Sequence, residues 1–395
     1  MSRASSAASS SKDETPKSLL PLPEAAIRHH MKTLEGPMKE WREKKRIPPV
    51  LLITGLPGVG KRSMSWYLSQ WILCERNGIQ SSQDDGQDSL FGMAPPPPVV
   101  EVDPNSEPRP CGECSNCLKA LHGTWIDFTE IESEDQDSEG NASGALKIEQ
   151  FRKLKSSLGF GGHDSMYRII LIPNADRMTV QAANSVLKLL EEPPAGWIFL
   201  LTAADSSLML PTIVSRCQTI RLKPFSRDSI EELLRLEDIE EKKIPICAEL
   251  AQGSWGKAVA WTQPETWEKR KIIVEFIQDP KSQLNALVDW ASSDPRNMDR
   301  MMDQLESLAS DLIRWSLSGV NPSAQPGSPE NYRWINSDAK TALVQNAKNA
   351  LKFGHERARV QWLSRAERLA RARVELQAPI NRKLLAQDLL MPWLG

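Results

Sequence analysis

The sequence predicts an α/β domain with a parallel sheet, followed by domains that are built only from helices. Up to about residue 223, short apolar runs of the strand type alternate with segments of helical spacing. A glycine-rich loop follows the first of these runs and leads into a helical segment. After Pro224 the strand pattern ends, and only helical patterns follow. Because strands that alternate with helices form mainly parallel sheets, we expect helices on both faces of the sheet.

Length and charge limit the possible organisation. A chain of 395 residues exceeds what one hydrophobic core usually organises. We expect a flexible tail at 1–20, the α/β domain at 21–223, a small helical domain at 224–282 and a second helical domain at 283–395. The formal net charge of −2 gives no overall basic signal, so contact with DNA would have to come from a local patch or from partners.

The sequence carries no signal for export or for a membrane. No stretch approaches the roughly 20 apolar residues that span a bilayer. The N-terminal segment lacks the apolar core of a secretory signal, so we expect a cytoplasmic protein without membrane contact. In that reducing compartment the six cysteines are not expected to form a disulfide framework.

The predicted elements follow from apolar spacing. Five runs read as strands: Val50–Thr54, Asp127–Ile131, Tyr167–Ile172, Trp197–Thr202 and Gln218–Leu222. Three segments of the α/β domain have helical spacing: one that begins at Lys61, one around Phe151, and Val180–Leu190. Beyond the α/β domain, three segments read as helices: Ser226–Leu234, Glu241–Ala251 and Glu265–Gln278. The last domain is also helical and is interrupted by a loop at Asn321–Asn331.

The glycine-rich segment Gly55-Leu-Pro-Gly58-Val-Gly60-Lys61-Arg62 lies between a strand and a helix, the context of a P-loop. In such a loop, backbone N–H groups and the helix N-terminus hold phosphates, and the lysine reaches the terminal ones. The next residue would be a Ser or Thr that binds magnesium, but it is Arg62, which has no acceptor atom. Gly55, Gly58, Gly60 and Lys61 are therefore candidate nucleotide-binding residues of a degenerate loop.

The acids of a nucleotide hydrolase are missing as well. An Asp-Glu pair would end the strand Tyr167–Ile172, hold magnesium and prepare water, but Pro173 and Asn174 stand there. Asp176 lies beyond the position of the pair. Because two magnesium functions are absent, the sequence argues against an active ATPase. It favours a loop that is kept for the fold or for weak binding of ATP.

Four cysteines have the spacing of a metal site. Cys111-Gly-Glu-Cys114-Ser-Asn-Cys117 is a CxxCxxC run, whose thiolates can converge on one tetrahedral zinc ion. A structural zinc site needs a fourth ligand. Cys74, at the end of the helix that follows the P-loop, is the first candidate, and His122 is the alternative.

The zinc ligands belong to an insertion that covers 74–122. Its middle part, at about 78–110, is rich in Ser, Asp, Gln and Pro. Such a composition cannot supply a packed core, so we expect a disordered loop there.

Longer motifs resemble a known family. The passage Ala182-Ala-Asn-Ser-Val-Leu-Lys-Leu-Leu-Glu-Glu-Pro-Pro194 is similar to the NxLLKxLEEPP helix end of the bacterial clamp-loader subunits of the AAA+ class. Ser215-Arg216-Cys217 matches the SRC motif of that family. The segment Asn381–Leu390 is similar to the last helix of the collar domain of the family. The resemblance covers about Pro21 to Leu394 and is strongest from Tyr167 to Leu222.

The resemblance implies what each domain is. The α/β domain at 21–223 would be an AAA+ P-loop domain with a zinc-binding insertion. The domain at 224–282 would be the helical lid, and the domain at 283–395 the all-α collar that joins subunits. Thr202 matches the polar sensor position of the family, and Gly256 stands where its ATPase subunits place a nucleotide-sensing arginine.

Within the family, the losses at Arg62, Pro173 and Asn174 resemble the delta-prime type of subunit, which does not hydrolyse ATP. The resemblance implies that Arg216 acts in trans, as an arginine finger in the ATP site of a neighbouring subunit. The sequence shows no obvious carboxylate partner for Arg216.

The function that the resemblance implies is help in loading the ring-shaped sliding clamp onto primed DNA. Catalysis would come from the DNA polymerase III holoenzyme and not from this chain. The implied partners are the clamp-loader ATPase subunits and the delta subunit, with the clamp met indirectly and primed DNA through the assembled complex. The alternative is a catalytically active clamp-loader ATPase of the gamma/tau type.

Overall fold

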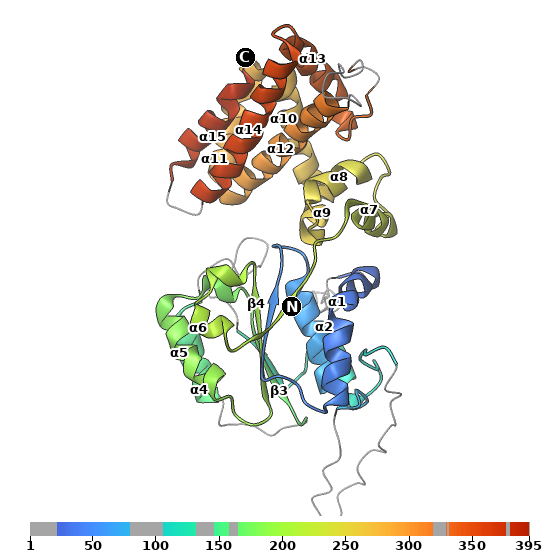
Figure 1. Cartoon of the computed structure of the whole chain (residues 1–395), viewed down its shortest axis with the longest axis vertical. Coiled ribbons are helices and arrows are strands. Elements are labelled where there is room, and N and C mark those ends of the chain that lie inside the picture. The colour runs from blue at the N-terminus through green and yellow to red at the C-terminus, as the bar shows by residue number, and fades with distance from the viewer. Residues whose placement is uncertain are drawn as a thin grey trace, which may run out of the picture. The chain divides into compact units, whose positions relative to one another are not determined.

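The computed structural model describes residues 22–79, 106–131, 146–157, 165–318, 329, 332–376 and 380–394. The chain forms two compact units, Met1–Pro224 and Phe225–Gly395 (Figure 1). The predictions of a flexible tail at 1–20, of disorder in most of the 78–110 loop and of a loop at Asn321–Asn331 lie largely outside the described residues.

The first unit is built around one sheet of five strands in the order β2-β3-β4-β1-β5. The strands are β1 (Val50–Thr54), β2 (Phe128–Glu130), β3 (Arg168–Ile172), β4 (Trp197–Ala203) and β5 (Gln218–Arg221). Every pair of neighbours is parallel, with Val50 opposite Phe199 and Arg168 opposite Trp197. The predicted parallel sheet is therefore confirmed.

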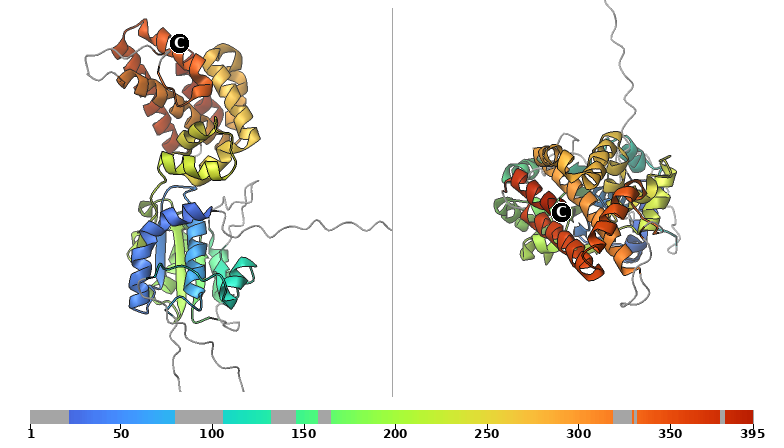
Figure 2. Two further views of the ribbon diagram at one scale, coloured as in Figure 1. Left: turned by 90° about the vertical axis from the view of Figure 1, so that its right-hand side faces the viewer. Right: turned by 90° about the horizontal axis from the view of Figure 1, so that it is seen from above.

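Helices cover both faces of this sheet (Figures 1 and 2). One face carries α1 (Glu24–Glu43) and α2 (Lys61–Leu73), and the other carries α4 (Ile148–Ser157), α5 (Val180–Glu191) and α6 (Pro211–Val214). Strands β1, β3 and β4 are buried along their whole length, because apolar side chains point to both faces. The short helix α3 (Ser115–Leu121) is fixed to the end of α2 by a hydrogen bond from Asn116 Nδ2 to Leu73 O, at 2.9 Å.

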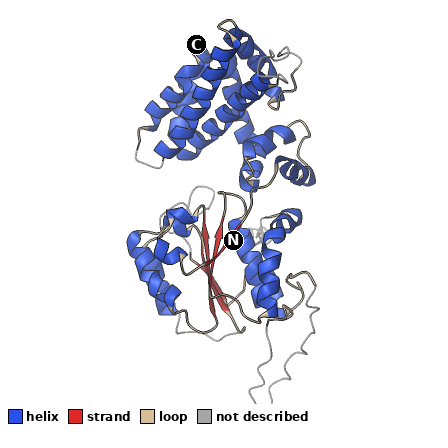
Figure 3. Ribbon diagram, in the orientation of Figure 1, coloured by secondary structure: helices blue, strands red, loops and turns tan. Residues whose placement is uncertain are grey.

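In the second unit, the described residues form helices and no strands (Figure 3). Helices α7 (Arg227–Leu236), α8 (Ile244–Ala251) and α9 (Trp255–Thr262) pack on one another. Six further helices share one core: α10 (Pro264–Gln278), α11 (Pro280–Ser293), α12 (Pro295–Leu317), α13 (Lys340–Leu351), α14 (His355–Glu375) and α15 (Arg382–Leu390). None of the described helices is long and apolar enough to cross a membrane.

Helix α10 packs differently from what the predicted domain boundary implies. The predicted lid at 224–282 includes α10, yet Ile273, Phe276 and Ile277 belong to the core of the C-terminal helices. Prolines at the first positions of α10, α11 and α12 separate these three helices along the chain. The spacing of apolar residues identifies a helix, but it does not identify which neighbour the apolar face meets.

Charged side chains join the two helical groups of this unit. The carboxylate of Asp303 on α12 is 3% exposed and pairs with Lys257 Nζ of α9 at 2.8 Å and with Arg373 Nη2 of α14 at 2.5 Å. On the same side, Arg314 Nη2 lies 2.5 Å from Glu249 Oε1 of α8. These ion pairs bind α8 and α9 to the larger helical group.

We expect Asp303→Asn to lower the free energy of unfolding by roughly 1–3 kcal/mol, because two cations lose their buried partner. The matched control is Asp289→Asn, which breaks the exposed pair with Lys383 and should cost less than about 0.5 kcal/mol. Urea titration of the two variants measures the difference, and equal effects would show that Asp303 does not join the helical groups.

Candidate functional site

The P-loop between β1 and α2 contains glycines at positions where other residues would be strained. Gly58 and Gly60 have φ angles of 73° and 104°, a region that other residues rarely adopt. A Cβ atom on Gly60 would lie 2.6 Å from Cδ1 of Leu22. The segment that leads into α1 therefore packs directly against the loop.

Helix α1 also holds the loop by a hydrogen bond, since His30 Nε2 lies 2.8 Å from Val59 O. Burial lowers the pKa of His30 to about 4, so the imidazole is neutral near pH 7. The sequence analysis missed α1, although its buried apolar residues repeat with helical spacing at Ile27, Met31, Leu34, Met38 and Trp41.

Lys61 is turned toward the backbone of its own loop. Its Nζ atom donates hydrogen bonds to Gly55 O at 2.7 Å and to Leu56 O at 3.0 Å. The residue is 8% exposed, and burial lowers the pKa of its amine to about 8. In a P-loop that holds nucleotide this amine would contact phosphates, whereas here carbonyl oxygens of the loop accept its hydrogen bonds.

Arg62 forms a two-pronged ion pair at the position that a magnesium-binding hydroxyl would occupy. Its Nε lies 2.6 Å from Glu130 Oε1, and its Nη2 lies 3.0 Å from Glu130 Oε2. Trp66 Nε1 donates to the same carboxylate at 3.1 Å. The position after Lys61 is thus filled by a cation and by the carboxylate that neutralises it.

The sequence analysis did not identify Glu130. The available signal was its place as the last residue of β2, because the carboxyl ends of parallel strands are where sites form in open α/β sheets. Its partner Arg62 is far away along the chain, so sequence spacing could not join the two residues.

The end of β3 holds structural hydrogen bonds in place of a pair of acids. Asn174 has a left-handed backbone, and its N–H donates to Thr202 Oγ1 at 3.0 Å. The carboxylate of Asp176 accepts from the N–H of Ala204 at 2.8 Å. These two bonds connect the end of β3 to the end of β4. The first of them uses the hydroxyl of Thr202, the residue at the predicted sensor position.

Arg216 lies between α6 and β5 and has an acidic partner within the chain. Its Nη2 is 2.8 Å from Glu191 Oε1, and its Nη1 donates to Thr212 O at 2.6 Å. The expectation that Arg216 has no carboxylate partner was therefore wrong. Glu191 ends α5, which packs against α6, and only the fold brings the two side chains together. The side chain of Arg216 remains 35% exposed.

The four predicted cysteines come together beside α2. The sulfur atoms of Cys74, Cys111, Cys114 and Cys117 all lie within 4.8 Å of one another. Cys74 ends α2, and Cys114 caps the N-terminus of α3. Backbone N–H groups donate to three of the sulfurs at 3.3–3.4 Å, an arrangement that favours thiolates.

This geometry fits a tetrahedral metal ion. With metal–sulfur bonds of about 2.3 Å, neighbouring sulfurs of a zinc tetrahedron lie roughly 3.8 Å apart. The Cys111–Cys117 and Cys114–Cys74 sulfur pairs are 3.9 and 4.0 Å apart, too far for disulfides. A hydrogen bond from the Cys117 thiol lowers the pKa of Cys74, and the same contact raises the pKa of Cys117. The cluster can therefore hold a metal ion on four thiolates.

The alternative ligand His122 does not belong to this cluster. It caps the C-terminus of α3 and is exposed, whereas Cys114 caps the opposite end of the same helix. Seven helical residues between the two caps separate them by roughly 10 Å at 1.5 Å per residue. Of the two candidates for the fourth ligand, the structure brings Cys74 to the triplet.

Together, the parallel sheet and the glycine-rich loop between β1 and α2 define an α/β domain of the P-loop type, and a helical second unit follows it. A family model described as "DNA polymerase III, delta subunit" matches residues 100–226. The DNA polymerase III subunit delta′ of Yersinia pestis is 26% identical, over 87% of this chain and 88% of that protein. The subunit delta′ of Pseudomonas aeruginosa is 25% identical, over 87% and 90% respectively.

Other matches are shorter or more distant. The tau subunit of Escherichia coli is 28% identical over 55% of this chain, which corresponds to 29% of that protein. The solved structure of a gamma-subunit-related protein from Thermotoga maritima aligns at a TM-score of 0.40 and 16% identity, over 92% of this chain and 98% of that chain. Along most of its length the chain is therefore similar to the delta-prime subunits of bacterial DNA polymerase III.

The cysteine cluster predicts which residues retain metal. Purified protein should contain about one metal ion per chain, and Cys74→Ser should lower this content, because only three thiolates remain. His122→Asn is the matched control and should leave the content unchanged. Elemental analysis by mass spectrometry identifies the ion and counts it. Loss of metal in His122→Asn, with retention in Cys74→Ser, would contradict the assignment of the fourth ligand.

Proposed function

We propose that this chain is a non-hydrolysing, delta-prime-like subunit of the DNA polymerase III clamp loader, which helps to load the sliding clamp onto primed DNA. The observation that carries the proposal is the state of its P-loop, where Arg62 and Glu130 neutralise each other at the magnesium position. The absence of an acid pair at Pro173 and Asn174 supports it. The match of delta-prime relatives along most of the chain supports it as well.

Binding of ATP at this loop would have to overcome the contacts of its own residues. Phosphates would need to draw Lys61 away from Gly55 O and Leu56 O. No hydroxyl follows the lysine to bind magnesium. In the second unit, Gly256 of α9 offers no side chain at the position of the nucleotide-sensing arginine. We therefore assign the loop a structural role, and the gamma/tau-like alternative loses support at each of these positions.

Arg216 is the residue through which the chain would act on a neighbour. Its pair with Glu191 is half-exposed, and exposed ion pairs contribute only about 0–1 kcal/mol. A phosphate in the ATP site of an adjacent subunit could therefore replace the carboxylate. The planar guanidinium matches phosphate oxygens and would stabilise the charge that develops during phosphoryl transfer.

The remaining features fit a structural subunit. In the proposed assembly the cysteine cluster holds a structural zinc ion, which would contribute on the order of 10 kcal/mol to the insertion. The helices of the second unit would join the ATPase subunits and the delta subunit. Primed DNA would be met through the assembled complex by contacts to backbone phosphates, and the clamp indirectly. The proposed function places the chain in the cytoplasm.

In an assembled clamp loader, Lys61→Ala in this chain should leave the total ATPase rate nearly unchanged, because in the proposed function Lys61 binds no nucleotide phosphate. The same substitution in the P-loop of an ATPase subunit is the positive control and should reduce turnover. The measurement is ATP hydrolysis in the presence of clamp and primed DNA. A large loss of turnover from the variant in this chain, with assembly intact, would mean that its P-loop works as a nucleotide site.

Arg216→Ala should slow ATP hydrolysis at the adjacent ATP site by roughly 10³–10⁵-fold, which is the usual rate contribution of an arginine finger supplied in trans. Arg216→Lys should be nearly as damaging, since lysine lacks the planar fork. Total turnover should fall in part, and clamp loading should fall further, because loading needs the whole cycle.

Two variants serve as controls for Arg216. Arg152→Ala removes another exposed arginine of the same unit and should change nothing. Glu191→Gln frees Arg216 and should leave turnover intact or raise it. Normal turnover and loading by an intact complex with Arg216→Ala would show that Arg216 is only a surface charge.

A further inference from the structure

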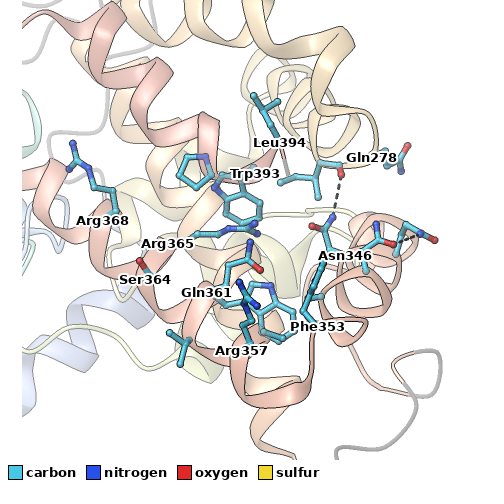
Figure 4. A pocket seen from close by; sticks show the side chains of 18 of the residues that line it. Gln278, Asn346, Phe353, Arg357, Gln361, Ser364, Arg365, Arg368, Trp393 and Leu394 are labelled. Atoms are coloured by element: carbon cyan, nitrogen blue, oxygen red, sulfur yellow. Dashed lines mark hydrogen bonds between the residues drawn. The ribbon is translucent and has the colours of Figure 1, made fainter.

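The second unit contains a pocket of about 940 Å³ between α10, α13, α14 and the C-terminal residues (Figure 4). Ligand pockets of proteins commonly measure 300–1,000 Å³, so this one is large enough for several amino-acid side chains. It lies far along the chain from the P-loop, from the cysteine cluster and from Arg216, and the proposed function does not use it.

A buried arginine lies at the centre of this pocket. Arg365 of α14 is only 6% exposed, and neither Nε nor Nη1 has a hydrogen-bond partner among the described residues. Its guanidinium lies over the ring of Trp393, 4.8 Å from the ring centroid. Figure 4 shows the two side chains against each other in the middle of the pocket. Buried guanidinium groups normally have carboxylates or carbonyls as partners, so the buried Nε and Nη1 donors show that Arg365 lacks the counter-charge such a group needs.

The other charges of the pocket do not compensate Arg365. Arg368, one turn further along α14, takes up both nearby carboxylates, with its Nη2 at 3.0 Å from Glu375 Oε2 and at 2.6 Å from Asp388 Oδ2. Arg357 is exposed at the pocket, 5.9 Å from the ring centroid of Phe353, and forms no ion pair with any described residue. The pocket therefore has an excess of positive charge from Arg357 and Arg365.

The remaining walls offer apolar and amide groups that suit a peptide. Phe353 is 70% exposed and offers apolar surface to a ligand, whereas Trp393 is 4% exposed and belongs to the core. The amides of Asn346 and Asn349 line the pocket as well. Asn346 Nδ2 donates within the chain, so its Oδ1 is the atom that could accept from a peptide backbone. Asn349 Oδ1 accepts within the chain, so its Nδ2 is the atom that could donate. The carboxylate of Asp388 also lines the pocket, where it is paired with Arg368.

We propose that this pocket docks an acidic segment of a partner protein, with one carboxylate on Arg365 and an adjoining apolar side chain against Phe353. Charge complementarity selects the occupant, because a carboxylate neutralises the charge of Arg365 and can accept from the parallel donors on one edge of its guanidinium, Nη2 with either Nε or Nη1. This inference goes beyond the proposed function, and it stands or falls independently of the ATP chemistry of Arg216.

The experiment begins with a library of random ten-residue peptides on phage, selected on the full-length chain and counter-selected on Arg365→Gln. Selected sequences should contain Asp or Glu next to an apolar residue. A synthetic copy with a fluorescent label is then titrated by anisotropy. Arg365→Gln should weaken binding by about tenfold to a hundredfold, the loss expected for charge-assisted hydrogen bonds.

Two further variants separate recognition from folding. Arg371→Gln makes the same change at an exposed position of α14 outside the pocket, and should alter binding by less than twofold. Phe353→Ser acts on an exposed side chain, so it should weaken binding without lowering the melting temperature. Arg365→Gln itself should keep or raise the melting temperature, because it removes a buried charge that lacks a partner.

Several outcomes would overturn the proposal. One is a selection that yields no acidic sequences, and another is binding that Arg365→Gln leaves unchanged. A lower melting temperature for Arg365→Gln, with Phe353→Ser binding normally, would make Arg365 a structural residue. Displacement of the labelled peptide by a 20-nucleotide DNA strand would identify the pocket as a nucleic-acid site. Displacement by 10 mM inorganic phosphate alone would identify it as a site for small anions.

Discussion

The ion pair between Arg62 and Glu130 is the interaction on which this account depends. It joins the first turn of α2 to the end of β2 and fills the place of a magnesium-binding hydroxyl. Lys61 then makes its hydrogen bonds within the loop, and α1 holds the loop through Leu22 and His30. A loop that makes such contacts with its own chain is stable without nucleotide. In the proposed function, the P-loop architecture is kept as a scaffold without its nucleotide chemistry.

This scaffold positions two further features, the cysteine cluster and Arg216. The helix that begins at the P-loop ends at Cys74, which brings the fourth thiolate to the triplet of the insertion. On the opposite face of the sheet, the contact between α5 and α6 places Arg216 beside Glu191 at the surface. Arg216 is held by an exposed ion pair, which costs little free energy to break, whereas the side chain of Lys61 is buried. In the proposed function, the same domain combines a P-loop that binds no nucleotide with an arginine that acts on a neighbouring subunit.

The sequence predicted well what depends on local patterns and poorly what depends on contacts between distant segments. All five strands follow from apolar runs, and the cysteine spacing indicated the metal cluster. The choice between Cys74 and His122 required the fold, because only the packing of α3 on α2 decides it. Glu130, Glu191 and the pocket around Arg365 could not be predicted, since each is formed by side chains that are far apart in the sequence. The packing of α10 in the core of the C-terminal helices could not be predicted for the same reason.

The most direct test of the central claim is ATP turnover by the purified chain alone. Magnesium and saturating ATP are supplied, with clamp and primed DNA added in a second series. The account predicts a rate equal to that of Lys61→Ala under every condition, because neither a magnesium ligand nor an acid pair is present. A saturable rate that Lys61→Ala abolishes would contradict it, and would show that the ion pair between Arg62 and Glu130 opens to admit nucleotide.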